Sequence, residues 1–225
     1  MSNVGHELAE SKGTCRGKCR AGRGVTLLWA TVLTGLAVGL CPGAGRIAHA
    51  GTITGWGYSG DGLGNLPTGN DFSAVAAGGG NWAVSLRYNG TLATWGYDLN
   101  GVVSNAPTSA GFTAIAAGFN HGYALRADGS IAAWGSDDQG QVSNTPGGTG
   151  FTAMAAGYNH GYALRADGSI AAWGQDVVGS VSNTPTGTGF VAIAAGYFCG
   201  FALQADGSIV AWGDDQLGPV SSAPL

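Results

Sequence analysis

Hydrophobic and polar positions recur along this chain with a long, regular period. Short apolar stretches alternate with glycine-rich polar stretches, and the dipeptide Trp-Gly returns every 39 residues. The tryptophans of these dipeptides are Trp56, Trp95, Trp134, Trp173 and Trp212. Periods of roughly 20–50 residues are typical of solenoids and propellers, in which each repeat folds as one supersecondary unit.

The unit from residue 112 to 150 predicts four short antiparallel strands. FTAIAA forms the first strand, with Phe112 and Ala114 expected on one side and Ile115 on the other, and GYAL forms the second strand. SIAAWG forms the third strand, and a fourth is expected near QVSNTP, where proline suits an outer edge. Four such strands per unit indicate a propeller blade.

A tight turn is predicted between the second and third strands of each unit. Asp-Gly is a strong hairpin signal because both residues can adopt a positive φ. The glycines that we assign to these turns are Gly129, Gly168 and Gly207.

Composition supports an all-β fold. The chain has 225 residues, of which 43 are glycine, and only 10% are charged. The glycines lack the strict three-residue spacing of collagen. The hydrophobic share of 44% argues against disorder, and scarce Lys and Glu argue against a helical bundle.

The first fifty residues have the pattern of a secretory signal peptide. Basic residues precede the uncharged run from Val25 to Cys41, and Ala48-His49-Ala50 has the small-x-small form of a cleavage site. We therefore predict residues 1–50 as signal peptide and leader, cleaved after Ala50, and residues 51–225 as the repeat domain. The mature protein would be secreted, periplasmic or on the cell surface, without membrane insertion. An uncleaved membrane anchor is the alternative.

Charge is distributed unevenly between these two parts. Residues 51–225 hold three Arg and eleven Asp, a formal net charge of −8. Such a surface repels a phosphate backbone, so we expect no binding of nucleic acid.

The segment AIAAGFNHGYALRADGSIAAWG resembles the repeat of the regulator-of-chromosome-condensation family, whose marks are Ala-Ala-Gly-x-x-His, a following Leu and then Trp-Gly. The resemblance covers residues 51–225, and it extends to a secreted bacterial β-lactamase inhibitory protein with similarly short repeats. It implies a seven-bladed propeller. Because residues 51–225 hold about 4.5 units of 39 residues, we expect an incomplete, open propeller of four-stranded blades. The alternatives are an open arc that stands alone, a truncated relative, or a half that pairs with a second copy as a homodimer through its open ends.

Aromatic side chains gather in the connection between the first and second strands of each unit. Aromatics and Asn on a rigid scaffold are typical of a protein-binding face, although the same rings could instead pack between blades. The residues that we assign to partner binding are Trp82, Phe119, Asn120, Tyr158, Asn159, Tyr197 and Phe198.

Four further sets of repeated positions are assigned structural roles. We expect His121 and His160 to tie their loops down by hydrogen bonds, and the Trp-Gly tryptophans to lie in the blade core. Asp98, Asp137, Asp176 and Asp215 follow each Trp by three residues and are expected to cap backbone amides. Arg87, Arg126 and Arg165 are expected to pair locally with Asp. A metal site is not expected, because the histidines lie in different blades with no nearby Cys pair.

Catalytic chemistry finds little support in residues 51–225. They contain no Lys, no Glu and two His, and no nucleophile elbow, Walker-type loop or His-Glu-x-x-His motif. We therefore predict a non-catalytic protein-interaction module without cofactors. The resemblance implies two alternatives, inhibition of an enzyme such as a β-lactamase and nucleotide exchange on a small GTPase.

Overall fold

The computed structural model describes residues 51–57, 59–216 and 219–223. The predicted signal peptide lies outside these described residues. Within them the chain is all-β, with one short 3-10 turn, η1 (Leu99–Gly101), after the third strand. No helix in the described segments is long and apolar enough to cross a membrane.

Twelve strands form four antiparallel sheets, each built from three strands that are consecutive in the sequence. The first two sheets consist of β1 (Phe72–Gly78), β2 (Trp82–Arg87) and β3 (Leu92–Gly96), then β4 (Phe112–Ala117), β5 (His121–Arg126) and β6 (Ile131–Gly135). The last two consist of β7 (Phe151–Ala156), β8 (His160–Arg165) and β9 (Ile170–Gly174), then β10 (Phe190–Ala195), β11 (Cys199–Gln204) and β12 (Ile209–Gly213).

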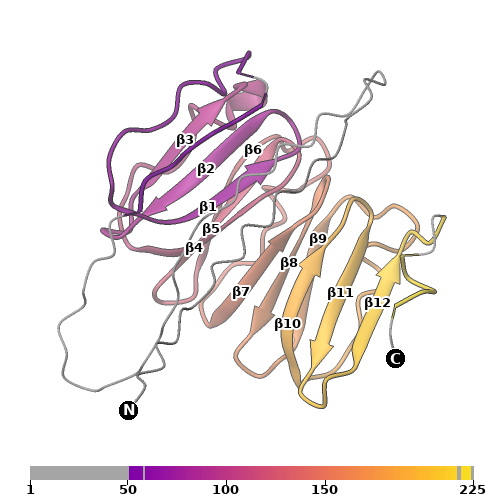
Figure 1. Cartoon of the computed structure of the whole chain (residues 1–225). Helices are drawn as coiled ribbons and strands as arrows, with labels where there is room; N and C mark the ends of the chain where they lie inside the picture. The colour runs from indigo at the N-terminus through magenta and orange to yellow at the C-terminus, as the bar shows by residue number, and fades with distance from the viewer. Residues whose placement is uncertain (1–50, 58, 217–218, 224–225) are drawn as a thin grey trace, which may run out of the picture.

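The four sheets follow one another as blades in an open array (Figure 1). The first strand of each blade contacts the first strand of the next, so that β1, β4, β7 and β10 form the inner side. The predicted array of propeller blades is confirmed. The first and last sheets lie at opposite ends of the array, so the propeller is not closed (Figure 1).

The fourth strand that we predicted in each blade is absent from the described residues, and the blades have three strands. In the second blade, residues 141–144 form turns instead. The backbone groups here bond elsewhere: Asp137 accepts the amides of Val142 and Ser143, and the Gln141 carbonyl accepts the Trp173 indole of the next blade. A ladder with the third strand is therefore not needed to satisfy them.

The first strand of each blade also differs from prediction in the side to which its residues point. A β-bulge shifts the register between Phe112 and Ala114. Phe112 consequently packs with Ile115 against the preceding blade, whereas Ala114 packs against the following one. The extra residue reverses the alternation that a regular strand would have. In the third strand, Ala132 and Ala133 pack against opposite neighbouring blades, as regular alternation requires.

The hairpin turns lie where Asp-Gly predicts them, but their geometry differs. Gly129 has a φ of +80°, while Asp128 is not among the residues with positive φ. The Arg126 carbonyl accepts the Gly129 amide, and the Arg126 amide donates to the Ser130 carbonyl. This is a three-residue loop with glycine in the left-handed position, rather than a two-residue turn. The Gly129 carbonyl accepts the Phe151 amide, which ties the hairpin to the next blade.

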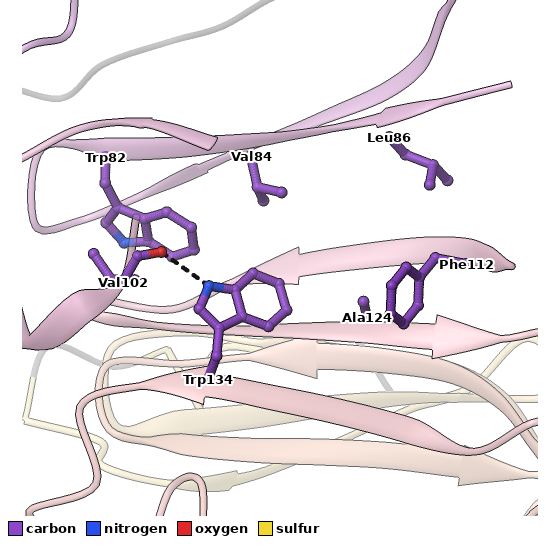
Figure 2. Close-up of a cluster of buried hydrophobic side chains, with 7 residues drawn as sticks. All are labelled: Trp82, Val84, Leu86, Val102, Phe112, Ala124 and Trp134. Carbon is purple, nitrogen blue, oxygen red and sulfur yellow. Dashed lines mark hydrogen bonds between the residues drawn. The ribbon is translucent and has the colours of Figure 1, made fainter. Parts of the chain in front are cut away.

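The hydrophobic core is divided among the junctions between blades. Figure 2 shows the first junction, where Trp134 of the second blade lies against Trp82, Val84 and Val102 of the first. The Trp134 indole donates to the Val102 carbonyl over 2.9 Å. The same bond joins Trp173 to Gln141 and Trp212 to Ser180, at a sequence separation of 32 residues each time. Each tryptophan thus fixes its own blade to the preceding one.

Candidate interaction face

The loops between the first and second strands of successive blades are hydrogen-bonded to one another. The Gly79 amide donates to the Gly118 carbonyl, the Phe119 amide to the Tyr158 carbonyl, and the Tyr158 amide to the Tyr197 carbonyl, over 3.2–3.3 Å. These bonds run from blade to blade along the inner side of the array. They hold the four loops at fixed relative positions, as a preorganised binding surface requires.

Four side chains on these loops form a continuous aromatic row, defined here as Phe119, Tyr158, Tyr197 and Phe198. The ring centroids of Phe119 and Tyr158 are 4.4 Å apart, and those of Tyr158 and Tyr197 are 4.2 Å apart. Phe198 meets Tyr197 edge-on at 4.5 Å. The row is accessible, because Tyr197 is 59% exposed and the other three rings are partly exposed.

An open hollow of about 220 Å³ lies along the row. Its lining combines small residues from equivalent positions of three blades, among them Ala117, Ala156 and Ala195, with Phe119, Tyr158 and Tyr197 of the aromatic row. The lining carries no charged side chain. A ligand in this hollow would meet aromatic faces and backbone groups.

Trp82 and Asn120 differ from their predicted role in partner binding. Trp82 is completely buried, and its indole donates to the Phe119 carbonyl over 2.9 Å. Asn120 is 8% exposed and lies beneath the loop of the first blade, against Gly80. The Trp82 indole thus joins its loop to the next one, and burial keeps both side chains from a partner. Asn159 is partly exposed, and its amide donates to the Gln175 side chain over 3.2 Å.

His121 and His160 lie under the same loops and are completely buried. The ring of each packs against the glycine three residues before it, where a Cβ atom would overlap the ring. We expected hydrogen bonds from these rings; the backbone of His160 lies close to the His121 ring and that of Cys199 close to the His160 ring, but none of the four ring nitrogens has a partner of good hydrogen-bond geometry among the described residues. Burial lowers the pKa of each histidine to about 4, so both rings are neutral at physiological pH. The room that Gly118 and Gly157 make for these rings was not predicted from the sequence, although each glycine precedes its histidine by the same three residues.

The loops that follow the third strand of each blade contain Asp98, Asp137, Asp176 and Asp215 and are called the acidic loops here. They border the aromatic row. Backbone bonds tie them to the inner loops, as from the Ser136 amide to the Asn120 carbonyl and from the Asp214 amide to the Phe198 carbonyl. Each aspartate three residues after a Trp accepts two backbone amides, as predicted: Asp98, Asp137, Asp176 and Asp215. The bonds to Val142 and Ser143 lower the pKa of Asp137, and its equivalents are lowered in the same way. These carboxylates stay charged at neutral pH.

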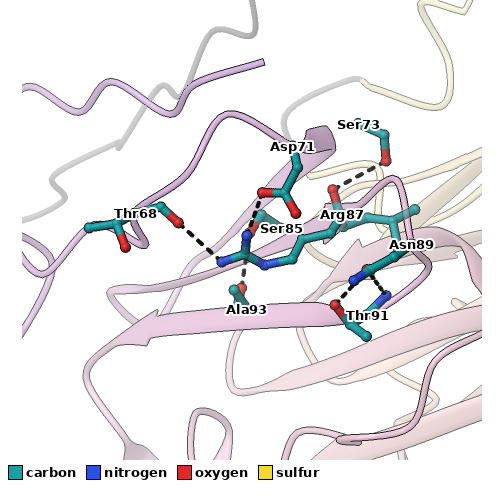
Figure 3. A network of polar contacts seen from close by, with 9 residues as sticks. Thr68, Asp71, Ser73, Ser85, Arg87, Asn89, Thr91 and Ala93 are labelled. Carbon is teal, nitrogen blue, oxygen red and sulfur yellow. Dashed lines mark hydrogen bonds and ion pairs between the residues drawn. The ribbon is translucent and has the colours of Figure 1, made fainter. Parts of the chain in front are cut away.

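The three arginines lie at the other end of the strands. Each guanidinium stacks over the first Phe of its own blade, at 4.4 Å for Arg87, 5.0 Å for Arg126 and 5.1 Å for Arg165. Arg87 also pairs with Asp71 and donates to the Thr68 carbonyl, as Figure 3 shows. This is the one ion pair among the described residues, so the local pairing expected for all three arginines holds for Arg87, and stacking replaces it in the other two.

No group of three His, Cys, Asp or Glu side chains in the described part of the chain could hold a metal ion. Cys199 occupies the position of His121 and His160 in the last blade and is buried. Burial raises the pKa of its thiol, which disfavours the reactive thiolate.

Comparison with known proteins agrees with the repeat architecture. Residues 112–141 and 151–180 match the regulator of chromosome condensation (RCC1) repeat. No curated protein sequence matches the chain.

Three solved structures have a similar fold. The CRINKLY WD40 ectodomain of the Arabidopsis thaliana receptor kinase ACR4 aligns with a TM-score of 0.58 and 25% identity, over 68% of this chain and 54% of that chain. The ectodomain of the Physcomitrella patens receptor kinase CR4 aligns with a TM-score of 0.57 and 25% identity, over 66% and 42% of the two chains. Yeast RCC1 (Prp20), solved with Kap60 bound, aligns with a TM-score of 0.56 and 20% identity, over 70% and 48%.

The aligned part therefore spans about half the length of these structures. The repeat match, the three-stranded sheets and the similar solved structures all indicate an array of propeller blades. Two blades of the array thus match the regulator of chromosome condensation (RCC1) repeat over residues 112–141 and 151–180, and the described residues fold as an open array of β-propeller blades.

Proposed function

We propose that this chain is a non-catalytic protein-interaction module that binds its partner along the aromatic row. The observation that carries the proposal is the ring-to-ring contact of Phe119, Tyr158 and Tyr197 on loops that are hydrogen-bonded across three blades. Aromatic anchors on a rigid base supply contact area at a low cost in conformational entropy.

The charge around the row favours a basic partner. The acidic loops border the row, and the three arginines lie at the opposite ends of the strands. A segment that combines Arg or Lys with apolar or aromatic residues would match both the carboxylates and the rings. Secretion belongs to the same proposal and rests on the pattern of residues 1–50.

A peptide array tests this proposal with defined probes. Purified full-length protein is applied to matched basic-aromatic, neutral-aromatic and acidic-aromatic peptides, and positive spots are measured in solution. We expect the basic-aromatic peptides to bind best and to weaken as salt rises. Tyr197→Ala and Tyr158→Ala should reduce their affinity at least tenfold.

Tyr88→Ala is the matched control, because Tyr88 is 48% exposed in the hairpin at the opposite end of the strands. Equal loss of affinity in all three variants, or retained affinity in the two row variants, would refute the role of the row. Inhibition of an enzyme would be one use of the same face, and assays against a panel of β-lactamases test that finer proposal.

A further inference from the structure

The face of the last sheet that points away from the array is exposed. In the first three blades this face packs on the next blade, and Leu86, Leu125 and Leu164 are 4–5% exposed. The equivalent Leu203 is 36% exposed, and Ala194 is exposed as well. Among the described residues no further sheet covers β10, β11 and β12 (Figure 1).

The opposite end of the array carries part of another blade. The Phe72 amide donates to the Gly51 carbonyl, as the Phe112 amide does to the hairpin glycine Gly90. Residues 52–57 therefore occupy the place of a third strand that precedes the first sheet. Their tryptophan, Trp56, is 56% exposed.

Trp56 stands apart from the other tryptophans of the Trp-Gly motif. Trp134, Trp173 and Trp212 are each 4% exposed because they pack on the blade before them. Each of the three donates its indole N–H to a carbonyl of that preceding blade. Trp56 has the same sequence context but no preceding blade among the described residues.

The last blade presents the position that such an indole would meet. The accepting carbonyls belong to Val102, Gln141 and Ser180, and the next position at the 39-residue period is Pro219. In the second and third blades a tyrosine hydroxyl donates to the same carbonyl. Phe201 replaces this tyrosine in the last blade and cannot donate to the Pro219 carbonyl as a tyrosine hydroxyl would.

We infer that the exposed face of β10–β12 binds the 52–57 segment of a second copy of this chain, head to tail, with Trp56 taking the place that Trp212 has at the preceding junction. The 52–57 segment offers a tryptophan, and the last sheet offers an apolar face beside the Pro219 carbonyl. The internal junctions join the same two kinds of surface. The segment and the last sheet lie at opposite ends of one copy, so a single copy cannot bring them together (Figure 1). The contact is heterologous, because different surfaces of the two copies meet. The residues of this contact lie outside the aromatic row, so the inference does not depend on the proposed function.

Sedimentation of the full-length protein over a wide concentration range tests this inference. We expect reversible, concentration-dependent association of the unmodified protein. Trp56→Ala and Leu203→Asp should each weaken it at least tenfold. Ala194→Arg is a second variant of the same face, to be used if Leu203→Asp fails to fold. Ala194 is exposed, so the arginine should obstruct the contact without disturbing the fold. Tyr88→Ala removes an equally exposed aromatic elsewhere and should associate normally.

Mixing the variants distinguishes head-to-tail contact from a symmetric dimer. Trp56→Ala keeps an intact last sheet, and Leu203→Asp keeps an intact 52–57 segment. An equimolar mixture should therefore form a dimer and stop there, although neither variant associates alone. A monomeric unmodified protein at all concentrations, undiminished association of Trp56→Ala, or a mixture that stays monomeric would overturn the inference. Peptide binding by the aromatic row is measured separately, so either proposal can fail alone.

Discussion

Replacing the junction tryptophans by phenylalanine should have unequal effects, because the carbonyls that they bond differ in their other donors. At the second junction the Gln141 carbonyl accepts two bonds, from the Trp173 indole over 3.0 Å and from the Tyr123 hydroxyl over 2.7 Å. At the first junction Val84 stands where Tyr123 stands in the next blade. Among the described residues, the Val102 carbonyl therefore has Trp134 as its only side-chain donor.

The difference can be expressed as a free energy of unfolding. Trp173→Phe removes one buried hydrogen bond, worth about 1 kcal/mol, and leaves the carbonyl bonded to Tyr123. Trp134→Phe removes the same bond and leaves a buried carbonyl without a donor, which costs about 1–3 kcal/mol. Both tryptophans are 4% exposed, so the loss of packing is similar. We expect Trp134→Phe to be the more destabilising, by up to about 2 kcal/mol.

Urea unfolding followed by far-ultraviolet circular dichroism measures both free energies without relying on tryptophan fluorescence. Tyr123→Phe with Trp173→Phe removes both donors at the second junction and should cost more than the two single changes added together. Equal destabilisation by Trp134→Phe and Trp173→Phe, with additivity in the double variant, would refute the role assigned to the carbonyls.

Three more predictions concern the loops around the aromatic row. The free energy of unfolding should fall as pH drops from about 6.5 toward about 4, by about 3 kcal/mol for each of His121 and His160. In this range the histidines of the unfolded chain become protonated, whereas the buried rings of the folded chain stay neutral. Urea midpoints at a series of pH values measure this. Gly118→Ala should destabilise the protein by about 1–3 kcal/mol, since its methyl group would overlap the buried His121 ring; thermal unfolding measures this. Asp137→Ala should lower stability by about 1 kcal/mol in the same assay, because two amides lose their acceptor.

Each of these predictions has a matched control within the chain. His160→Cys copies Cys199 of the last blade and should flatten the pH dependence, and an unchanged slope would contradict the role of the ring. Gly147→Ala meets no atom within 4 Å and should be neutral. Asp138 accepts only the Ser136 hydroxyl among the described hydrogen bonds, so Asp138→Ala should cost less than Asp137→Ala.

Local signals in the sequence were sufficient for the repeat, the hairpins and the third strand. Trp134 recurs at a fixed period, and Asp128-Gly129 marks a turn by backbone preference alone. The β-bulge after Phe112 could not be predicted, because a bulge is a property of two paired strands and Thr113 has no distinguishing preference. The missing fourth strand depends on Trp173 of the next blade, which competes for the carbonyl that a ladder would use.

The site was predicted in part. Spacing predicted Phe119, Tyr158 and Tyr197 in equivalent loops, and in the structure their rings contact one another in series. Trp82 occupies an equivalent position to His121 and is buried like it, because Gly78 leaves room for the indole as Gly118 does for the imidazole. Whether an aromatic side chain faces solvent or the neighbouring loop is decided by tertiary packing, which the repeat pattern alone does not contain.

The uniform junctions bear on how such a chain can change over generations. Residues 112–150 and 151–189 differ at seven of 39 positions, and the indole-to-carbonyl bond is the same at three junctions. Unequal recombination between such similar gene segments would add or delete one whole unit. Every remaining junction would still join a tryptophan to a compatible carbonyl. The number of blades, and with it the length of the aromatic row, can therefore vary without the invention of a new interface.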